Sequence, residues 1–234
     1  MLKSINKNFR TLYKAIGNEP MTQIFGNVIR KIIGLHPVMV EANVDINEQK
    51  VGYQEYLRLR NKALFKKKII SSKCDLISIV MIETPSSDTL DLAYQSLLEQ
   101  RVHPHQILII SQRKGLVYEG AKVCTTIDEA INQVKTDYIV FAQSNHRFHP
   151  CFVQEFMLYL KTHNVDILHT CYDNIHNGIQ QEPQWLPQLN QHLLYSNNYI
   201  GNTILVKRSL GEKIQWFKTK FFATAYIYDF IFRA

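Results

Sequence analysis

Short apolar runs alternate with helical patterns from Leu76 onward, and this alternation constrains the fold more than any other feature of the sequence. The runs from Leu76 to Ile82 and from Tyr138 to Ala142 are rich in β-branched residues and apolar at nearly every position. Strands of this kind are typically buried on both faces, as in parallel sheets covered by helices. The alternation therefore predicts an α/β fold with a mixed, mostly parallel sheet flanked by helices.

The same patterns predict the order of the elements. Helical spacing is clearest between Thr89 and Gln100, where Leu90, Tyr94 and Leu97 share one face. The polar stretch 173–191 reads as a loop. The predicted strands cover 76–82, 106–111, 122–125, 138–142, 166–170 and part of 198–210, and the predicted helices cover 89–100, 127–135 and 151–162.

Residues 1–70 differ from the rest of the chain in charge. They hold thirteen Lys and Arg against five Asp and Glu, whereas the whole chain carries a net charge of +7. Amphipathic patterns predict helices over 2–16, 21–33 and 54–68. The predicted organisation is therefore a basic helical extension over 1–70 and a main domain over 71–234.

Two interpretations of the basic extension stay open. Its helices could dock their apolar faces on the main domain while Lys and Arg stay solvated. Alternatively, residues 1–34 could bind an anionic membrane surface, as basic amphipathic helices do. The two interpretations differ in whether the positive charge has a partner.

Several classes of protein are disfavoured by composition. The start of the chain has no apolar core of a secretory signal, and no apolar run approaches the roughly 20 residues of a spanning helix. The four cysteines form no C-x-x-C pair. Aromatic residues in the basic third fit helix faces, so a nucleic-acid partner is not expected. We expect a cytoplasmic protein that could also lie peripherally at the inner face of the membrane.

A polar turn ends the apolar run at Tyr138–Ala142. The residues that follow are Gln143, Ser144, Asn145 and His146. In open α/β sheets, ligands bind just beyond the carboxyl ends of the strands. The sequence therefore predicts a ligand site here, built from amides and an imidazole where carboxylates would be expected.

Six sequence pieces in a fixed order resemble family 2 glycosyltransferases, which have the GT-A fold, and bacterial O-antigen, capsule and rhamnan enzymes in particular. The resemblance implies a UDP-, GDP- or dTDP-linked sugar donor and a glycan or lipid-linked acceptor. A helical segment usually follows the last piece in this family, which implies that this chain is truncated or degenerate. The pieces are "YQEYLRLR", "ISIVM", "SLLEQ", "DYIVFAQSNHRFHP", "LPQLNQHLLYSNNYIGNTILVKRSL" and "YDFIFR".

The resemblance also implies binding residues. Trp185 could stack on a sugar, and Asn197 and Asn198 could shape the acceptor pocket, although Asn198 and Gly201 could instead only set backbone turns. The residues at positions that would bind the nucleotide sugar are Thr84, Ser111, Gln112, Arg113, Gln143, Ser144 and Asn145.

Mg²⁺ or Mn²⁺ is implied by the family, whose carboxylates hold the ion on the diphosphate. Here those positions carry Gln143 and Asn145, so no cofactor is firmly predicted. Asn145 and His146 are the only weak metal candidates, and His146 with His149 forms an H-x-x-H pattern that could also be two loop histidines. Arg113, Lys114 or Arg147 could supply the positive charge directly.

The catalytic carboxylates of the family are also depleted. The position of the family's base is Ile227, which cannot accept a proton, and only Asp229 remains in that motif. A second acidic motif keeps Asp173 alone. Asp229 and Asp173 are therefore the candidate catalytic residues. Two functions stay open: a polysaccharide glycosyltransferase with doubtful activity, or an inactive pseudo-glycosyltransferase that binds or scaffolds.

Overall fold

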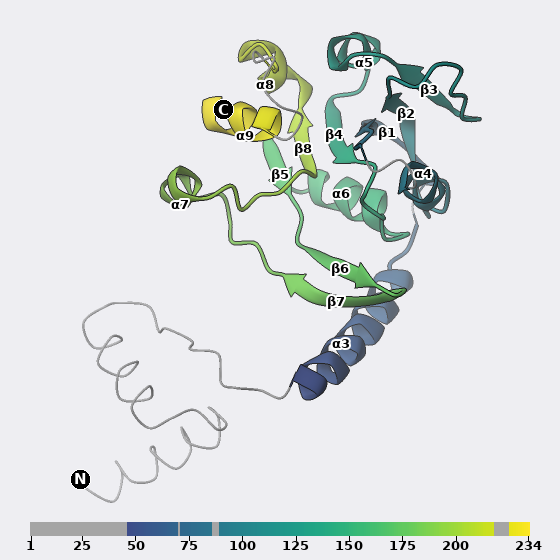
Figure 1. Cartoon of the computed structure of the whole chain (residues 1–234), viewed down its shortest axis with the longest axis vertical. Coiled ribbons are helices and arrows are strands. Elements are labelled where there is room, and N and C mark those ends of the chain that lie inside the picture. The colour runs from purple at the N-terminus through teal and green to yellow at the C-terminus, as the bar shows by residue number, and fades with distance from the viewer. Residues whose placement is uncertain (1–45, 70, 86–88, 218–224) are drawn as a thin grey trace, which may run out of the picture. The chain divides into compact units, whose positions relative to one another are not determined.

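The structure of the chain is a computed structural model that describes residues 46–69, 71–85, 89–217 and 225–234 (Figure 1). The helices predicted over 2–16 and 21–33 lie outside these residues. The chain separates into two compact units, Met1–Leu57 and Arg58–Ala234. The boundary falls within helix α3, Ile46–Lys66, so the second unit contains the predicted domain 71–234 together with the last turns of that helix.

A six-stranded sheet forms the centre of the second unit. Strand β1 is parallel to both β2 and β4, β3 is parallel to β2, and β8 is antiparallel to β4 and β5. The predicted mixed, mostly parallel sheet is therefore confirmed. In the order β3-β2-β1-β4-β8-β5, the strands are Ala121–Cys124, His103–Ile110, Lys73–Ile82, Tyr138–Gln143, Ile204–Lys207 and Ile167–His169.

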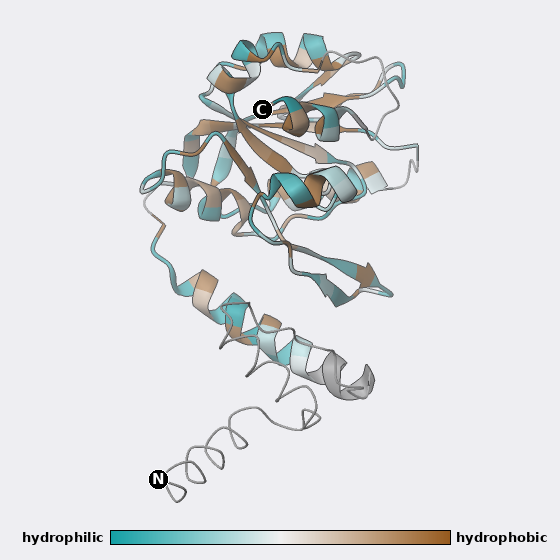
Figure 2. Cartoon of the chain, turned by 90° about the vertical axis from the view of Figure 1, so that its left-hand side faces the viewer, coloured by the Kyte–Doolittle hydropathy of each residue, from teal (hydrophilic) through white to brown (hydrophobic). Residues whose placement is uncertain are grey.

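Helices cover both faces of this sheet. Buried residues of α4 and α6 share one core cluster with the sheet, and those of α5, α7 and α9 share another. In Figure 2 the brown, hydrophobic strands lie enclosed between helices. The helices are Leu90–Leu98 (α4), Ile127–Gln133 (α5), Phe152–Leu160 (α6), Gln191–Ser196 (α7), Arg208–Lys213 (α8) and Ala225–Arg233 (α9).

Strand β1 shows why these apolar runs form a central strand. Side chains alternate between the two faces of a strand. Ile77, Ile79 and Met81 accordingly pack in the cluster of α4 and α6, and Val80 packs in the opposite cluster. All four are fully buried. The one polar side chain between them, Ser78, is also fully buried, and its hydroxyl is hydrogen-bonded to that of Thr136 at 2.7 Å.

The prediction of a loop over 173–191 is wrong in its first half. The structure has a β-hairpin there, formed by β6, Tyr172–His176, and β7, Ile179–Gln184. Its turn residues Asn177 and Gly178 have φ of 52° and 79°, the conformation that an Asn-Gly hairpin turn requires. The hairpin forms its own two-stranded sheet with both faces largely exposed, so its strands lack the alternation of polar and apolar residues.

The other boundaries shift by a few residues. The strand within 198–210 is limited to β8, because Arg208 begins helix α8. Helix α3 begins earlier than the predicted residue 54 and ends at Lys66. Among the described residues, none of the helices is both long and apolar enough to span a membrane.

Candidate functional site

The carboxyl ends of β1, β2 and β4 lie side by side and bring the predicted binding residues together. Ile82 is in register with Ile110 of β2 and with Gln143 of β4. The chain runs from β1 to β2 on one side, and the later strand β4 pairs on the other side. In doubly wound sheets this reversal marks the ligand crevice. We call Glu83, Thr84, Ser111, Arg113, Gln143 and Ser144 the strand-end cluster.

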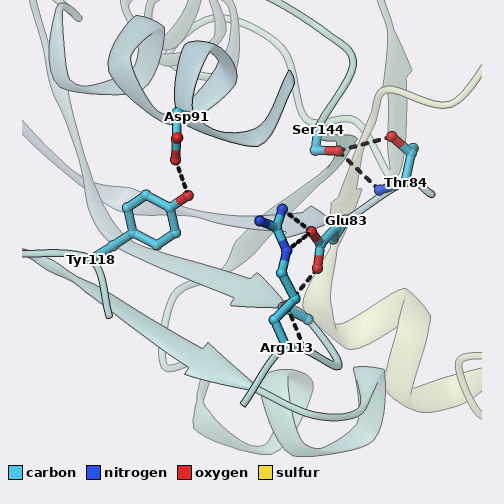
Figure 3. A network of polar contacts seen from close by, with 7 residues as sticks. Glu83, Thr84, Asp91, Arg113, Tyr118 and Ser144 are labelled. Carbon is cyan, nitrogen blue, oxygen red and sulfur yellow. Dashed lines mark hydrogen bonds and ion pairs between the residues drawn. The ribbon is translucent and has the colours of Figure 1, made fainter. Parts of the chain in front are cut away.

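Thr84 and Ser144 form a direct link across the reversal point (Figure 3). The Ser144 hydroxyl accepts a hydrogen bond from the backbone N–H of Thr84 at 2.9 Å, and the two hydroxyl oxygens are also 2.9 Å apart. The Ser144 backbone N–H donates to the Ile82 carbonyl at 2.9 Å. Ser144 is fully buried, so this predicted binding residue holds β1 and β4 together.

Glu83 is the residue in this cluster that the sequence reasoning missed. Its carboxylate accepts a hydrogen bond from the Ser111 hydroxyl at 2.5 Å and forms an ion pair and a hydrogen bond with the Arg113 guanidinium. The Glu83 side chain is 13% exposed and that of Arg113 is 43% exposed. An acid directly after a buried strand is the signal that could have identified Glu83.

Charge in this part of the cluster is balanced internally. Burial by itself would raise the pKa of Glu83, but hydrogen bonds from Arg113 and Ser111 outweigh burial and lower that pKa. The bond to Glu83 raises the pKa of Arg113. Next to this pair, the Tyr118 hydroxyl donates to the Asp91 carboxylate (Figure 3), and burial together with that bond raises the pKa of Tyr118 to about 12.

The turn after β4 is tied to the segment before β8. The Asn202 amide donates to the Gln143 side-chain oxygen at 3.1 Å, and His146 Nδ1 lies 2.8 Å from the Thr203 hydroxyl. Gln143 is buried, whereas Asn145 is exposed. The sequence reasoning missed Asn202 and Thr203, because their neighbours are about 60 residues away in the chain.

The turn does not fit a divalent metal ion of the Mg²⁺ or Mn²⁺ type. Such ions favour carboxylate oxygens, and Gln143, Asn145 and His146 provide neutral donors. Burial lowers the pKa of His146. His149 does not complete a pair with His146, because its Nε2 faces Asn61 at 3.0 Å and its Nδ1 accepts from the Cys151 N–H at 3.1 Å.

Metal-ligating groups are also scarce elsewhere. Within the part of the chain that the structure describes, no three His, Cys, Asp or Glu side chains are grouped closely enough to hold a metal ion. Two hollows, of about 500 and 250 Å³, are lined by residues such as Lys122 and Arg208 and by no member of the strand-end cluster. The described residues of the cluster thus form a hydrogen-bonded set of side chains that lacks the group of ligands a metal ion needs.

The other predicted nucleotide-sugar residue lies at the rim. Gln112 is exposed and its amide donates to the Thr125 carbonyl at 2.6 Å. Arg113 and Ser111 are also linked locally, since the Arg113 backbone N–H donates to the Ser111 hydroxyl at 3.0 Å. The predicted residues after β1, β2 and β4 are therefore neighbours in space, and most of them bind one another.

The two candidate catalytic acids lie on other elements. Asp229 is on α9, where its carboxylate pairs with Arg233 at 2.9 Å, and the Arg233 guanidinium also donates to two backbone carbonyls. Asp173 is on β6 and accepts from the Gln180 amide of β7 at 3.1 Å. Each acid thus has a partner on its own helix or hairpin. Neither partner is a member of the strand-end cluster.

The candidate acceptor residues lie between β7 and β8. Trp185 directly follows β7 and is 60% exposed. Asn197 ends helix α7 and, like Asn198, is exposed. Their segment leads directly into Asn202 and Thr203, which contact the turn after β4.

Comparison with known proteins gives a likeness to solved structures only. No protein-family model matches the chain, and no curated protein matches it. A structure of S. aureus TarS 1–349 has a TM-score of 0.48 and 12% identity over 68% of this chain and 54% of that chain. TarS 1–349 in complex with UDP-GlcNAc has a TM-score of 0.47 and 14% identity over 60% and 48%.

A third solved structure is the mannosyltransferase PcManGT from Pyrobaculum calidifontis in complex with GDP-Man and Mn²⁺. Its TM-score is 0.45 with 11% identity, over 76% of this chain and 59% of that chain. The chain thus spans about half to three-fifths of the length of these structures. At such scores the likeness supports neither an activity nor a ligand for this chain.

The Glu83–Arg113 pair, in which only the carboxylate is buried, predicts a pH-dependent stability. Because the pKa of Glu83 is lowered in the fold, the pair stabilises the fold at pH above the ordinary value of 4.5 and loses this effect as the pH falls through the lowered pKa. Glu83→Gln should lower the thermal midpoint by about 2–4 °C at pH 7 and by much less at pH 3, as measured by circular dichroism.

A matched control is Glu99→Gln, which removes an exposed carboxylate at the end of α4. It should leave the midpoint unchanged at both pH values. Equal effects of Glu83→Gln at pH 7 and pH 3 would contradict a stabilising charge on Glu83.

Proposed function

We propose that this chain is a glycosyltransferase-type protein that binds a nucleotide sugar at the strand-end cluster and acts in cell-surface polysaccharide assembly, with impaired transfer. The observation that carries the proposal is the convergence of Thr84, Ser111 and Ser144 at the reversal point between β1 and β4. Ordered sequence resemblance to family 2 glycosyltransferases supports the same assignment. The donor would be a UDP-, GDP- or dTDP-linked sugar, and the acceptor a glycan or a lipid-linked glycan.

In this proposal, positive charge for the diphosphate comes from Arg113 and not from a metal ion. The Arg113 guanidinium is held by Glu83 at the cluster and is 43% exposed. Guanidinium groups bind phosphate oxygens through several parallel N–H donors. Lys114, which follows Arg113 in the chain, and Arg147, in the turn after β4, are also exposed and could add charge.

Calorimetry with UDP, GDP, dTDP and their glucose conjugates tests donor binding. We expect one nucleotide to bind with the same affinity in Mn²⁺ and in EDTA, because the turn after β4 has no carboxylate. Arg113→Ala should weaken that binding about tenfold, the loss of roughly 1.4 kcal/mol of interaction. Lys122→Ala, which removes an exposed lysine on β3, is the matched control and should have no effect.

Absence of heat with every nucleotide would exclude the proposed donor site. Binding that requires Mn²⁺ would retain the site and contradict the role of Arg113 as the source of charge.

A second candidate is an inactive binding or scaffold module. It is favoured by the internal bonding of the cluster, in which Glu83 pairs with Arg113 and Thr84 with Ser144. It is also favoured by Ile227 at the position of the family's catalytic base. A module of this kind would bind a nucleotide sugar or a glycan and would transfer nothing.

Release of nucleoside diphosphate from the bound donor, measured with neutral oligosaccharide acceptors, separates the two candidates. Slow turnover that Asp173→Asn or Asp229→Asn abolishes would establish the enzyme. Arg233→Gln is the control for Asp229, because it breaks the same ion pair and leaves the carboxylate in place. No turnover at all would favour the module. Turnover that neither Asp173→Asn nor Asp229→Asn changes would exclude the module and contradict a catalytic role for both acids.

Peripheral membrane binding by residues 1–34 is a separate proposal about residues outside the described part of the chain. Its support is the excess of Lys and Arg on amphipathic patterns. Flotation with vesicles containing phosphatidylserine should recover the protein, and replacing Lys3, Lys7, Arg10 and Lys14 by Gln should abolish recovery. Equal flotation of both proteins would show that this charge has no role in binding.

A further inference from the structure

A surface rich in aromatic and amide side chains lies between β6 and β8. Three of its aromatic residues are widely exposed: Tyr172 by 50%, Trp185 by 60% and Tyr195 by 59%. Exposed amides accompany them at Gln184, Gln188 and Asn198. We call these six residues the amide-aromatic surface. Exposed apolar residues mark a binding surface when they lie together, whereas single scattered ones are normal on any protein.

The segments of this surface are joined to one another. The Leu186 N–H donates to Cys171 Sγ at 3.3 Å, which holds the end of the hairpin at Tyr172 beside the Trp185 segment. The Tyr199 hydroxyl accepts from the Asn190 N–H at 2.7 Å and donates to the Gln188 carbonyl at 3.0 Å. These hydrogen bonds between successive segments hold the surface in a defined arrangement.

The surface is also continuous with the strand-end cluster. Tyr172 Cε1 is 3.6 Å from the place that a Cβ would take on Gly201. The next residue, Asn202, donates to Gln143 at the end of β4. A ligand on the amide-aromatic surface would therefore lie on the acceptor side of the proposed donor site.

Cations are absent from this part of the sequence. No Lys or Arg occurs from residue 162 to residue 206, although the chain has 27 of them. The acids in that stretch are Asp166, Asp173 and Glu182. Asp173 accepts from Gln180, and Glu182 accepts from Asn174 at 3.0 Å. This stretch therefore offers no Lys or Arg to an anionic polymer or an anionic membrane.

Aromatic and amide groups together match the two chemical sides of an uncharged sugar. A pyranose ring presents C–H groups on its faces, which pack on aromatic rings, and hydroxyl groups at its rim. An amide side chain can donate to one hydroxyl and accept from another. An apolar peptide or a lipid would use the aromatic groups and leave the amides without partners.

We propose that the amide-aromatic surface binds a neutral glycan, which on the proposed function is the acceptor. Glycans that contain uronic acid, sialic acid or phosphate should bind more weakly, because residues 162–206 provide no Lys or Arg. Trp185 and Tyr172 are the stacking residues, and Gln184 and Asn198 contact hydroxyl groups. The position of an acceptor site does not by itself determine whether the acceptor is charged. The proposal adds that the acceptor is neutral.

Binding is tested by calorimetry in the absence of any nucleotide. The probes are six-unit oligomers of glucose, mannose, galactose and N-acetylglucosamine, compared with oligogalacturonate and oligo-glycerol phosphate. We expect at least one neutral oligomer to bind and the acidic oligomers not to bind. The affinity should be unchanged between about 50 and 500 mM NaCl, because no ion pair forms.

Variants locate the binding. Trp185→Ala and Tyr172→Ala should each weaken the neutral oligomer about tenfold, while Trp185→Phe retains most of the affinity. Tyr159→Ala is the matched control, since it removes a 40% exposed aromatic residue on α6, outside this surface. Thermal melts check that each variant is folded.

Three outcomes would overturn the proposal: tighter binding of an acidic oligomer, neutral binding that Trp185→Ala leaves unchanged, and no binding of any oligomer. Loss of self-association or of vesicle binding in Trp185→Ala, without glycan binding, would assign the surface to a second copy or to a lipid. Because no nucleotide is present, these results are independent of the donor site. Glycan binding without nucleotide binding would refute only the proposed donor site.

Discussion

Burial of both faces of β1 and β4 is the constraint on which the rest of the structure depends. A strand enclosed by helices on both sides is mostly apolar inside the sheet, where a polar group needs a buried partner, as Ser78 has in Thr136. Most of its polar groups therefore lie where it leaves the sheet. Ile82 and Gln143 end in register at the point where the strand order reverses. Glu83, Thr84 and Ser144 are consequently brought within hydrogen-bonding distance of their neighbours by the packing of the sheet, whatever chemistry they serve.

The net charge at this sheet edge is the same as that of a metal site, but the groups that carry the charge are different. A divalent ion held by two carboxylates has a net charge of zero, and so does one carboxylate with one guanidinium. The Glu83–Arg113 pair could therefore occupy the same sheet edge without the desolvation penalty of a lone buried charge. What changes is direction, because a guanidinium offers N–H donors in one plane whereas a metal ion attracts oxygen from every side.

Much of this arrangement could be predicted from the sequence, and the failures have physical causes. The central strands were predictable because both of their faces are buried, which makes their sequences almost wholly apolar. The β6–β7 hairpin was not, because its faces are largely exposed and only the Asn-Gly pair at 177–178 marks it. The neutral turn at 143–146 could be predicted from its position alone. Its partners Asn202 and Thr203 could not, since they precede an antiparallel strand that returns some 60 residues later.

The uneven distribution of charge connects these observations. Lys and Arg are concentrated in residues 1–70 and absent from 162–206, while Glu83 and Arg113 of the strand-end cluster neutralise each other. Long-range attraction can therefore act through the basic extension, but not at the amide-aromatic surface, where recognition must depend on contact. Recognition by contact is favoured when the segments that carry the side chains are held in place, and the hydrogen bonds of Tyr199 and Cys171 link these segments.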